Sequence, residues 1–157
     1  MEIDLVTRLN HHIENEQYDG MLPYKDIHDN EEYMRLYKGR GAIWRTQPSG
    51  IYNCHGLTFA SKRTRVFSTN EIRKILQEDA YIKISIENVF PGDIILYVTN
   101  IGDITHSGII LSVERNVLGL FPMVLSKWGN GSEVFHSYNN CPYFASDIST
   151  EFYRIDK

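Results

Sequence analysis

Cysteine is scarce in this chain of 157 residues, and long apolar runs are missing. Its two cysteines, Cys54 and Cys141, are too few for a disulfide framework. No apolar run approaches the ~20 residues that span a membrane. The N-terminal residues (MEIDL) also carry acid where a signal peptide carries base. We therefore expect no membrane association and a location in the cytoplasm, unless another route exports the protein.

An excess of positive charge is missing as well. Lysine and arginine number 16 against 20 aspartates and glutamates, which gives a net charge of −4 at pH 7. This balance argues against a nucleic-acid partner or an anionic membrane surface. The short basic run at residues 62–65 is interpreted as a solvated helix end. A hydrophobic share of 42% is ordinary for a globular protein, and we expect a single domain, residues 1–157.

The order of sequence patterns predicts helices first and strands afterwards. Residues 2–16 have apolar positions near helical spacing, and residues 68–71 (STNE) match a capping box before a second helical pattern. The stretch 17–50 is expected to wrap the core, with a short helix at residues 31–37. Strands are expected at residues 81–86, 93–98, 104–113, 121–128, 133–137 and 150–155. We therefore predict an α+β fold, with N-terminal helices packed on a mostly antiparallel β-sheet; residues 1–50 form an extension and residues 51–157 the core.

Cys54 has the most informative surroundings in the chain. A turn-prone stretch at residues 47–50 (QPSG) leads into Asn53, a favourable N-cap, and then into a predicted helix of about residues 53–64. Cys54 would lie in the first helical turn, where unpaired N–H groups and the helix dipole favour an anion. A thiol there ionises more readily, and the thiolate is the reactive form. Cys141 lies in a turn-forming context and is interpreted as an inert thiol.

A cysteine nucleophile needs a base within hydrogen-bonding reach, and the chain has six histidines. His106 is the strongest candidate, because it opens an apolar strand after a polar turn and is followed by the small residues Ser107 and Gly108. His55 is interpreted as a packing or substrate-contact residue, since neighbours on a helix point in different directions. Three further histidines are expected at the surface: His11, His12 and His28.

The base in turn needs a group that orients it. His136 and Glu133 lie on a short alternating strand, and either would serve to hold the His106 imidazole in its useful tautomer. Lys127, just upstream, would stabilise a thiolate or bind an acidic substrate, although a lysine at a strand end is more commonly solvated. The candidate catalytic residues are therefore Cys54, His106 and His136.

The order of these segments resembles the NlpC/P60 superfamily of papain-like cysteine peptidases and amidases. Three motifs carry the resemblance: NCHG at residues 53–56, PGDIILY at residues 91–97 and THSGIIL at residues 105–111. The similarity covers residues 51–136. It departs from the family at Asn53 and His55, which stand where an Asp and a Ser are usual. His136 also lies further beyond His106 than the family's third polar residue, which an inserted hairpin around residues 114–121 would explain.

The resemblance implies a papain-like fold and a bacterial cysteine hydrolase that acts on a peptide or amide. Cys54 would form a thioester, its backbone N–H would help to stabilise the oxyanion, and His106 would protonate the leaving amine. No cofactor is implied. Cell-wall peptide is the family's commonest substrate, but a protein substrate inside the cell stays open, as does the oligomeric state. Because the cysteine precedes the histidine, the permuted relatives that resemble lecithin:retinol acyltransferase are disfavoured.

Three alternatives stay open. The same Cys–His pair would serve an acyltransferase or a deamidase-type effector acting on a protein, and the acceptor, water or an amine, separates these from a hydrolase. A non-catalytic binding domain could share the fold. Four side chains could in principle bind zinc, namely Cys54, His106, His136 and Cys141. No Cys-x-x-Cys or His-x-x-x-His spacing supports a metal site, so we expect none.

Overall fold

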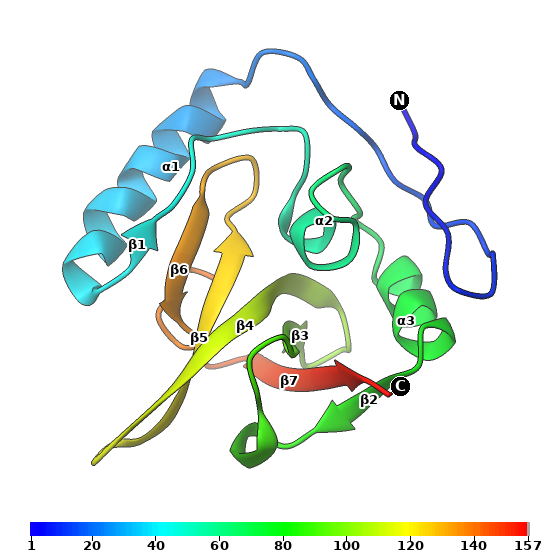
Figure 1. Cartoon of the computed structure of the whole chain (residues 1–157). Coiled ribbons are helices and arrows are strands. Elements are labelled where there is room, and N and C mark those ends of the chain that lie inside the picture. The colour runs from blue at the N-terminus through cyan, green and yellow to red at the C-terminus, as the bar shows by residue number, and fades with distance from the viewer. Residues whose placement is uncertain (157) are drawn as a thin grey trace.

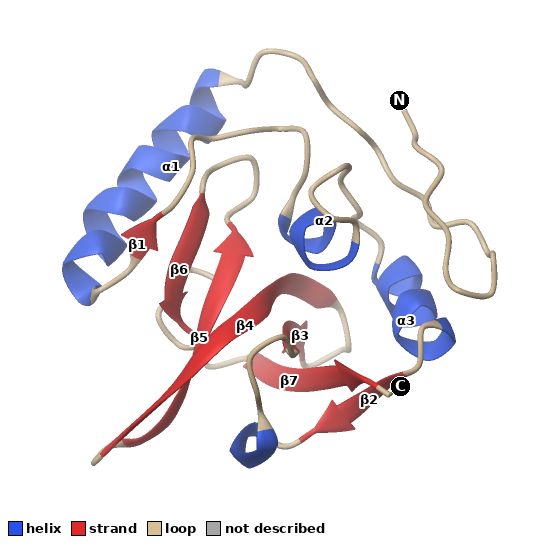
Figure 2. Ribbon diagram, viewed as in Figure 1, coloured by secondary structure: helices blue, strands red, loops and turns tan. Residues whose placement is uncertain are grey.

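A computed structural model describes residues 1–156 and consists of a seven-stranded antiparallel sheet with three α-helices (Figures 1 and 2). The helices are α1 (Tyr24–Tyr37), α2 (Cys54–Phe59) and α3 (Thr69–Glu78), with short 3-10 helices at Lys38–Arg40 and Ile86–Asn88. The strands are β1 (Ile43–Trp44), β2 (Tyr81–Ile84), β3 (Ile94–Thr99), β4 (Ile104–Asn116), β5 (Gly119–Lys127), β6 (Glu133–Ser137) and β7 (Ile148–Ile155). The predicted α+β class is confirmed. Among the described residues, no helix has the length and apolar character needed to cross a membrane.

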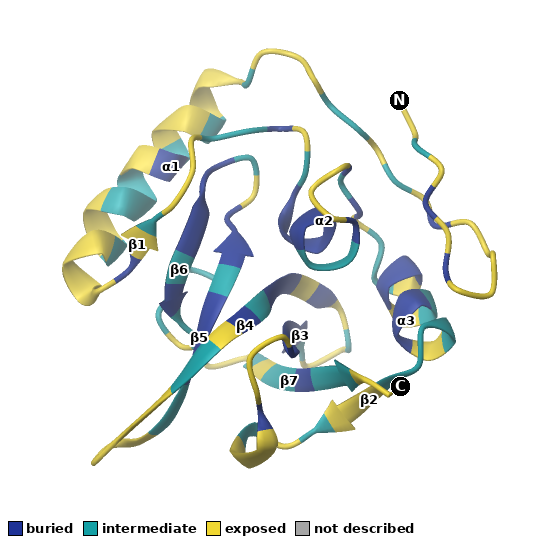
Figure 3. Cartoon of the chain, viewed as in Figure 1, coloured by how far each residue is buried: buried dark blue, intermediate teal, exposed yellow. Residues whose placement is uncertain are grey.

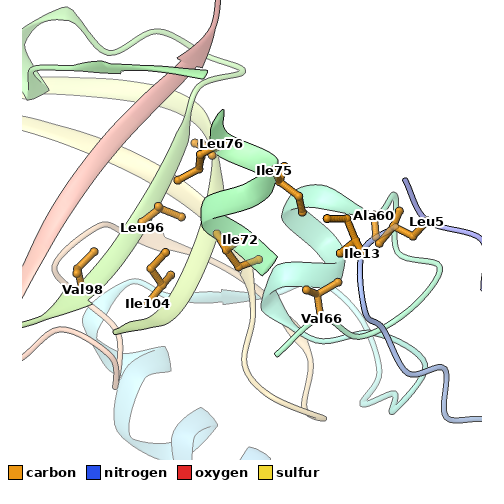
Figure 4. Close-up of a cluster of buried hydrophobic side chains, with 11 residues drawn as sticks. Leu5, Ile13, Ala60, Val66, Ile72, Ile75, Leu76, Leu96, Val98 and Ile104 are labelled. Atoms are coloured by element: carbon orange, nitrogen blue, oxygen red, sulfur yellow. The ribbon is translucent and has the colours of Figure 1, made fainter. Parts of the chain in front are cut away.

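The sheet separates two hydrophobic cores. Its strand order is β1-β6-β5-β4-β3-β7-β2, and every neighbouring pair is antiparallel. Successive side chains of a strand point to opposite faces, so Leu96 of β3 packs with α3 in one core and Tyr97 packs in the other. Figure 4 shows the first core, where α3 and the N-terminal segment meet β3 and the start of β4. The second core holds Trp128 and side chains of α1.

The helix expected at residues 2–16 is wrong. This segment is a loop in which Val6 pairs with His12 in an isolated β-bridge, and Figure 2 shows no helix before α1. The chain folds back so that Leu5 and Ile13 are both buried, with a hydrogen bond of 2.8 Å from the Ile13 N–H to the Leu5 carbonyl oxygen. Of the residues whose spacing predicted this helix, Ile13 is buried but Val6 and Leu9 are exposed, so they do not form one buried face.

Several other boundaries differ from the prediction. α1 begins at Tyr24 and not near residue 31. Most of its outer face is exposed (Figure 3), so the first turns carry few apolar residues from which a helix could be predicted. α2 ends at Phe59, because Ser61 and Lys62 adopt left-handed backbone angles (φ 51° and 64°) that stop a helix. The two-residue strand β1 was not predicted. The hairpin expected around residues 114–121 is present as the turn between β4 and β5.

Gly56 lies where α2 touches the loop that follows it. A Cβ atom at this position would lie 1.9 Å from the backbone carbonyl oxygen of Thr64, so alanine would have to displace backbone. We expect Gly56→Ala to lower the free energy of unfolding by about 2 kcal/mol or more, measured by urea denaturation. Gly39→Ala is the matched control, because a Cβ there would meet nothing within 4 Å. Equal unfolding midpoints for the two variants would contradict this tight contact.

Candidate active site

Asn53 fixes the start of α2 and so places Cys54. Its Oδ1 accepts hydrogen bonds from the backbone N–H groups of Gly56 (2.9 Å) and Val66 (3.1 Å). Its Nδ2 donates to the Val66 carbonyl oxygen (2.8 Å). The predicted N-cap is therefore present, and it also ties the helix start to the chain beyond α2. Cys54 is the first residue of the helix, and its own N–H donates to no acceptor within residues 1–156.

His106, on β4, lies close enough to the Cys54 sulfur for each group to shift the pKa of the other. Both side chains are buried, with 0% exposure for His106 and 7% for Cys54. Burial lowers the pKa of His106, and the nearby Cys54 sulfur offsets only part of this effect. Neither ring nitrogen of His106 has a hydrogen-bond partner of ordinary geometry in the described chain. Unpaired buried polar atoms are uncommon in native proteins. His106 therefore has the free nitrogen that a catalytic base requires.

His55 also faces the sulfur, which was not predicted. Its Nδ1 lies 2.8 Å from Ser107 Oγ, and that hydroxyl donates to Thr58 Oγ1 (2.9 Å). Thr58 Oγ1 in turn donates to the Cys54 carbonyl oxygen (2.9 Å). The Thr58 hydroxyl proton points to the Cys54 carbonyl oxygen and the Ser107 hydroxyl proton points to Thr58. Ser107 Oγ can therefore only accept from His55, so Nδ1 of His55 is the donor. Burial lowers the pKa of His55, but the Cys54 sulfur and the Ile104 carbonyl outweigh it, so the pKa is raised.

One thiol is therefore flanked by two imidazoles. Burial raises the pKa of the Cys54 thiol, but His55 and His106 outweigh this effect and hold the pKa well below its ordinary value. The thiolate is the nucleophilic form of cysteine. The arrangement thus favours a reactive sulfur at neutral pH, with positive charge placed more readily on His55, whose pKa is raised, than on His106, whose pKa is lowered.

His136, expected to orient His106, has both of its nitrogens engaged elsewhere. Nδ1 donates to the Ser137 carbonyl oxygen (2.7 Å), which can only accept. Nε2 therefore accepts from Ser126 Oγ (2.7 Å), and Ser126 Oγ accepts from Trp128 Nε1 (3.0 Å). Burial lowers the pKa of His136 to about 3, so the ring is neutral. The sequence prediction is corrected here, because a side chain with no free nitrogen cannot hydrogen-bond the base.

Glu133, the other candidate for orienting His106, is engaged on a different side. Its carboxylate accepts a hydrogen bond from the Tyr52 hydroxyl and pairs with Lys62 Nζ at 3.0 Å. It makes no hydrogen bond to the ring nitrogens of His106. Glu133 therefore holds Tyr52, two residues before Cys54, and stabilises the approach to α2.

Lys127 is buried and donates two hydrogen bonds to backbone carbonyl oxygens. Its Nζ donates to the carbonyl oxygens of Ser49 (2.5 Å) and Gly129 (2.9 Å) and lies 4.9 Å from the Tyr52 ring centroid. Burial lowers the pKa of Lys127 to about 8. Two of its three protons are so engaged, and Lys127 ties the segment before Cys54 to the end of β5.

The second cysteine differs from the first. Cys141 is a free, buried thiol whose sulfur lies 3.9 Å from the Tyr138 carbonyl oxygen, and burial raises its pKa. No three His, Cys, Asp or Glu side chains between residues 1 and 156 are grouped to hold a metal ion. Cys54, His106, His136 and Cys141 therefore do not form such a group.

Comparisons with known proteins do not identify the chain. No protein-family model, no curated protein and no solved structure matches it. The NlpC/P60 resemblance of the sequence motifs therefore stays a prediction. The arrangement of Cys54, His55 and His106 is the basis for the function proposed below.

Proposed function

We propose that this protein is a cysteine hydrolase that cleaves a peptide or amide bond, with Cys54 as nucleophile and His106 as base. One observation carries the proposal: the Cys54 sulfur lies at the start of α2 between two imidazoles that lower its pKa. The unpaired ring nitrogens of His106 support the same role. A buried thiol in an inert site would instead have a raised pKa, as Cys141 does.

The reaction proceeds through a thioester. The Cys54 thiolate attacks the carbonyl carbon, and the oxyanion that forms accepts a hydrogen bond from the unpaired Cys54 N–H. His106, as the base, takes up the proton lost by the thiol and passes it to the departing amine as the C–N bond breaks. His106 then takes a proton from water, the hydroxide attacks the thioester, and the acid leaves as the thiolate is restored.

The order of segments supports a papain-like fold of the NlpC/P60 type for this enzyme. The helix-start cysteine, the strand β3 and the histidine on β4 follow one another as in that family's motifs. Asp93 of the PGD motif has a structural role, since it binds the Arg154 guanidinium through two contacts of 2.8 and 2.7 Å. The substrate class we propose is a cell-wall peptide or a protein amide.

A non-catalytic binding domain is the second candidate, and burial of the pair favours it. His106 has no exposed surface and Cys54 has little, so a substrate reaches them only after neighbouring side chains move. A non-catalytic domain does not need a substrate to reach Cys54 and His106, so it would need no such movement.

Product formation that depends on Cys54 tests the proposed hydrolase. The protein is incubated with purified peptidoglycan and with cell lysate in H₂¹⁸O, and products are identified by mass spectrometry. We expect acid products that carry ¹⁸O with the wild type and with Cys141→Ala, and none with Cys54→Ala. Products without ¹⁸O would indicate acyl transfer to an amine. Absence of wild-type product from both substrates, or its persistence in Cys54→Ala, would contradict the proposal.

A further inference from the structure

Tyr143 covers one face of the His106 ring. The two rings are stacked almost parallel, with centroids 3.6 Å apart and an interplanar angle of 7°. Tyr97, the neighbour of His106 on β3, packs at 5.3 Å with a tilt of 54°. Tyr143 belongs to the loop between β6 and β7. This loop therefore makes a close contact with the candidate base.

Apart from the Cys54 sulfur, no polar group holds the His106 ring. Its two ring nitrogens make no hydrogen bond of ordinary geometry within residues 1–156, and the side chains predicted to hold it, His136 and Glu133, bond elsewhere. A general base has to keep its ring at a set angle to the nucleophile. The ring is completely buried, and its aromatic contacts with Tyr143 and Tyr97 restrict this angle.

Tyr143 in turn packs against a second aromatic residue, Trp128. Its ring meets the Trp128 ring edge to face at 6.4 Å, and Trp128 also contacts His136 at 5.4 Å. Ser126 Oγ links these two by bonding both Trp128 Nε1 and His136 Nε2. The rings of His136, Trp128 and Tyr143 therefore form a series of contacts that ends at His106.

We propose that Tyr143 is the positioning residue of His106, and that its stacked ring takes the role usually filled by a hydrogen-bonding third residue. This inference rests on the proposed function of Cys54 and His106. The ring, and not the hydroxyl, carries the effect, because the contact to His106 is face to face. Burial and the nearby Cys54 sulfur raise the pKa of Tyr143 well above its ordinary value, so the hydroxyl stays neutral and adds no charge to the site.

The pH dependence of Cys54 alkylation tests the role of Tyr143. Iodoacetamide labelling of Cys54 is followed by peptide mass spectrometry, which separates it from Cys141. Tyr143→Phe keeps the ring and should match the wild-type profile within about twofold. Tyr143→Leu removes the ring; the apparent pKa of Cys54 should rise by about one unit or more, with a roughly tenfold slower reaction on the acid side. Phe144→Leu, at the exposed neighbouring position, is the matched control.

Three outcomes would overturn the assignment of Tyr143. If Tyr143→Leu shows the wild-type pH profile of Cys54 alkylation, or reacts faster at every pH, Tyr143 only shields the site and does not position His106. A Phe variant as impaired as the Leu variant would place the effect on the hydroxyl. The ring-current shift of the His106 Cε1 proton, lost in Tyr143→Leu and kept in Tyr143→Phe, gives a second readout in the folded protein. An ordinary Cys54 pKa in the wild type would instead refute the proposed hydrolase, so the two failures are distinguishable.

Discussion

His106→Gln is expected to reduce Cys54-dependent hydrolysis by about 10²–10⁴-fold, because it removes the group that transfers protons in both half-reactions. Glutamine is similar in size to histidine, so the stacked Tyr143 keeps a neighbour of similar shape. The loss should extend over the whole pH range, since glutamine does not titrate. Product release is measured with whichever substrate gives a Cys54-dependent product.

Alkylation of Cys54 in this variant distinguishes the role of His106 as a base from its effect on the pKa of the thiol. His55 still lies beside the sulfur after His106→Gln, so iodoacetamide labelling of Cys54 at pH 7 should fall much less than hydrolysis, by about tenfold for each unit by which the thiol pKa rises. His28→Gln, at an exposed position in α1, is the matched control and should change neither rate. Hydrolysis that survives His106→Gln within tenfold of the wild type would contradict the role of His106.

His55→Gln is expected to produce the second largest effect, with a different pH profile. A folded-state thiol with a lowered pKa is ionised, and reactive, at pH values where an ordinary thiol is protonated. Loss of His55 should raise the pKa of Cys54, so alkylation at pH 6 falls by about tenfold per unit of change and recovers as the pH passes the ordinary thiol value. The readout is the alkylation rate of Cys54 between pH 5 and pH 10.

The serine that anchors His55 provides a graded control. Ser107→Ala removes the acceptor of Nδ1 but leaves the imidazole in place, so the shift in the Cys54 profile should be smaller than in His55→Gln. A His55→Gln profile that overlays the wild type would show that His55 does not act on the thiol. His106 alone would then account for any lowering of the pKa.

The sheet was predictable because strand signals are local. Residues 133–137 were assigned to a strand with the bounds that β6 has, and the other five expected strands each overlap one in the structure. The predicted helix at residues 2–16 is wrong because apolar spacing does not by itself show burial: Val6 and Leu9 fit the spacing but are exposed, and the chain folds back before Ile13. Strand β1 was missed because two residues carry too little periodicity to be recognised.

The site was predictable where the residue's own segment determined its place. Asn53 and Cys54 were found because an N-cap is a local pattern, and His106 because it follows a polar turn at the start of a strand. The sequence does not predict that His55 faces the sulfur, because neighbouring helical side chains usually diverge. In the structure His55 contacts Ser107, which lies on a distant segment of the chain. Tyr143 gave no sequence signal, since its loop becomes part of the site only once β6 and β7 are placed.

The pH dependence of alkylation at the two cysteines of the wild-type protein decides whether Cys54 is an activated nucleophile. The two thiols share one chain and are both buried, so each serves as the reference for the other. Labelling of Cys54 should titrate well below the ordinary thiol pKa of about 8.5, whereas labelling of Cys141 should titrate above it. Two thiols that react at similar rates and titrate together near 8.5 would refute the activated cysteine, and with it the proposed hydrolase.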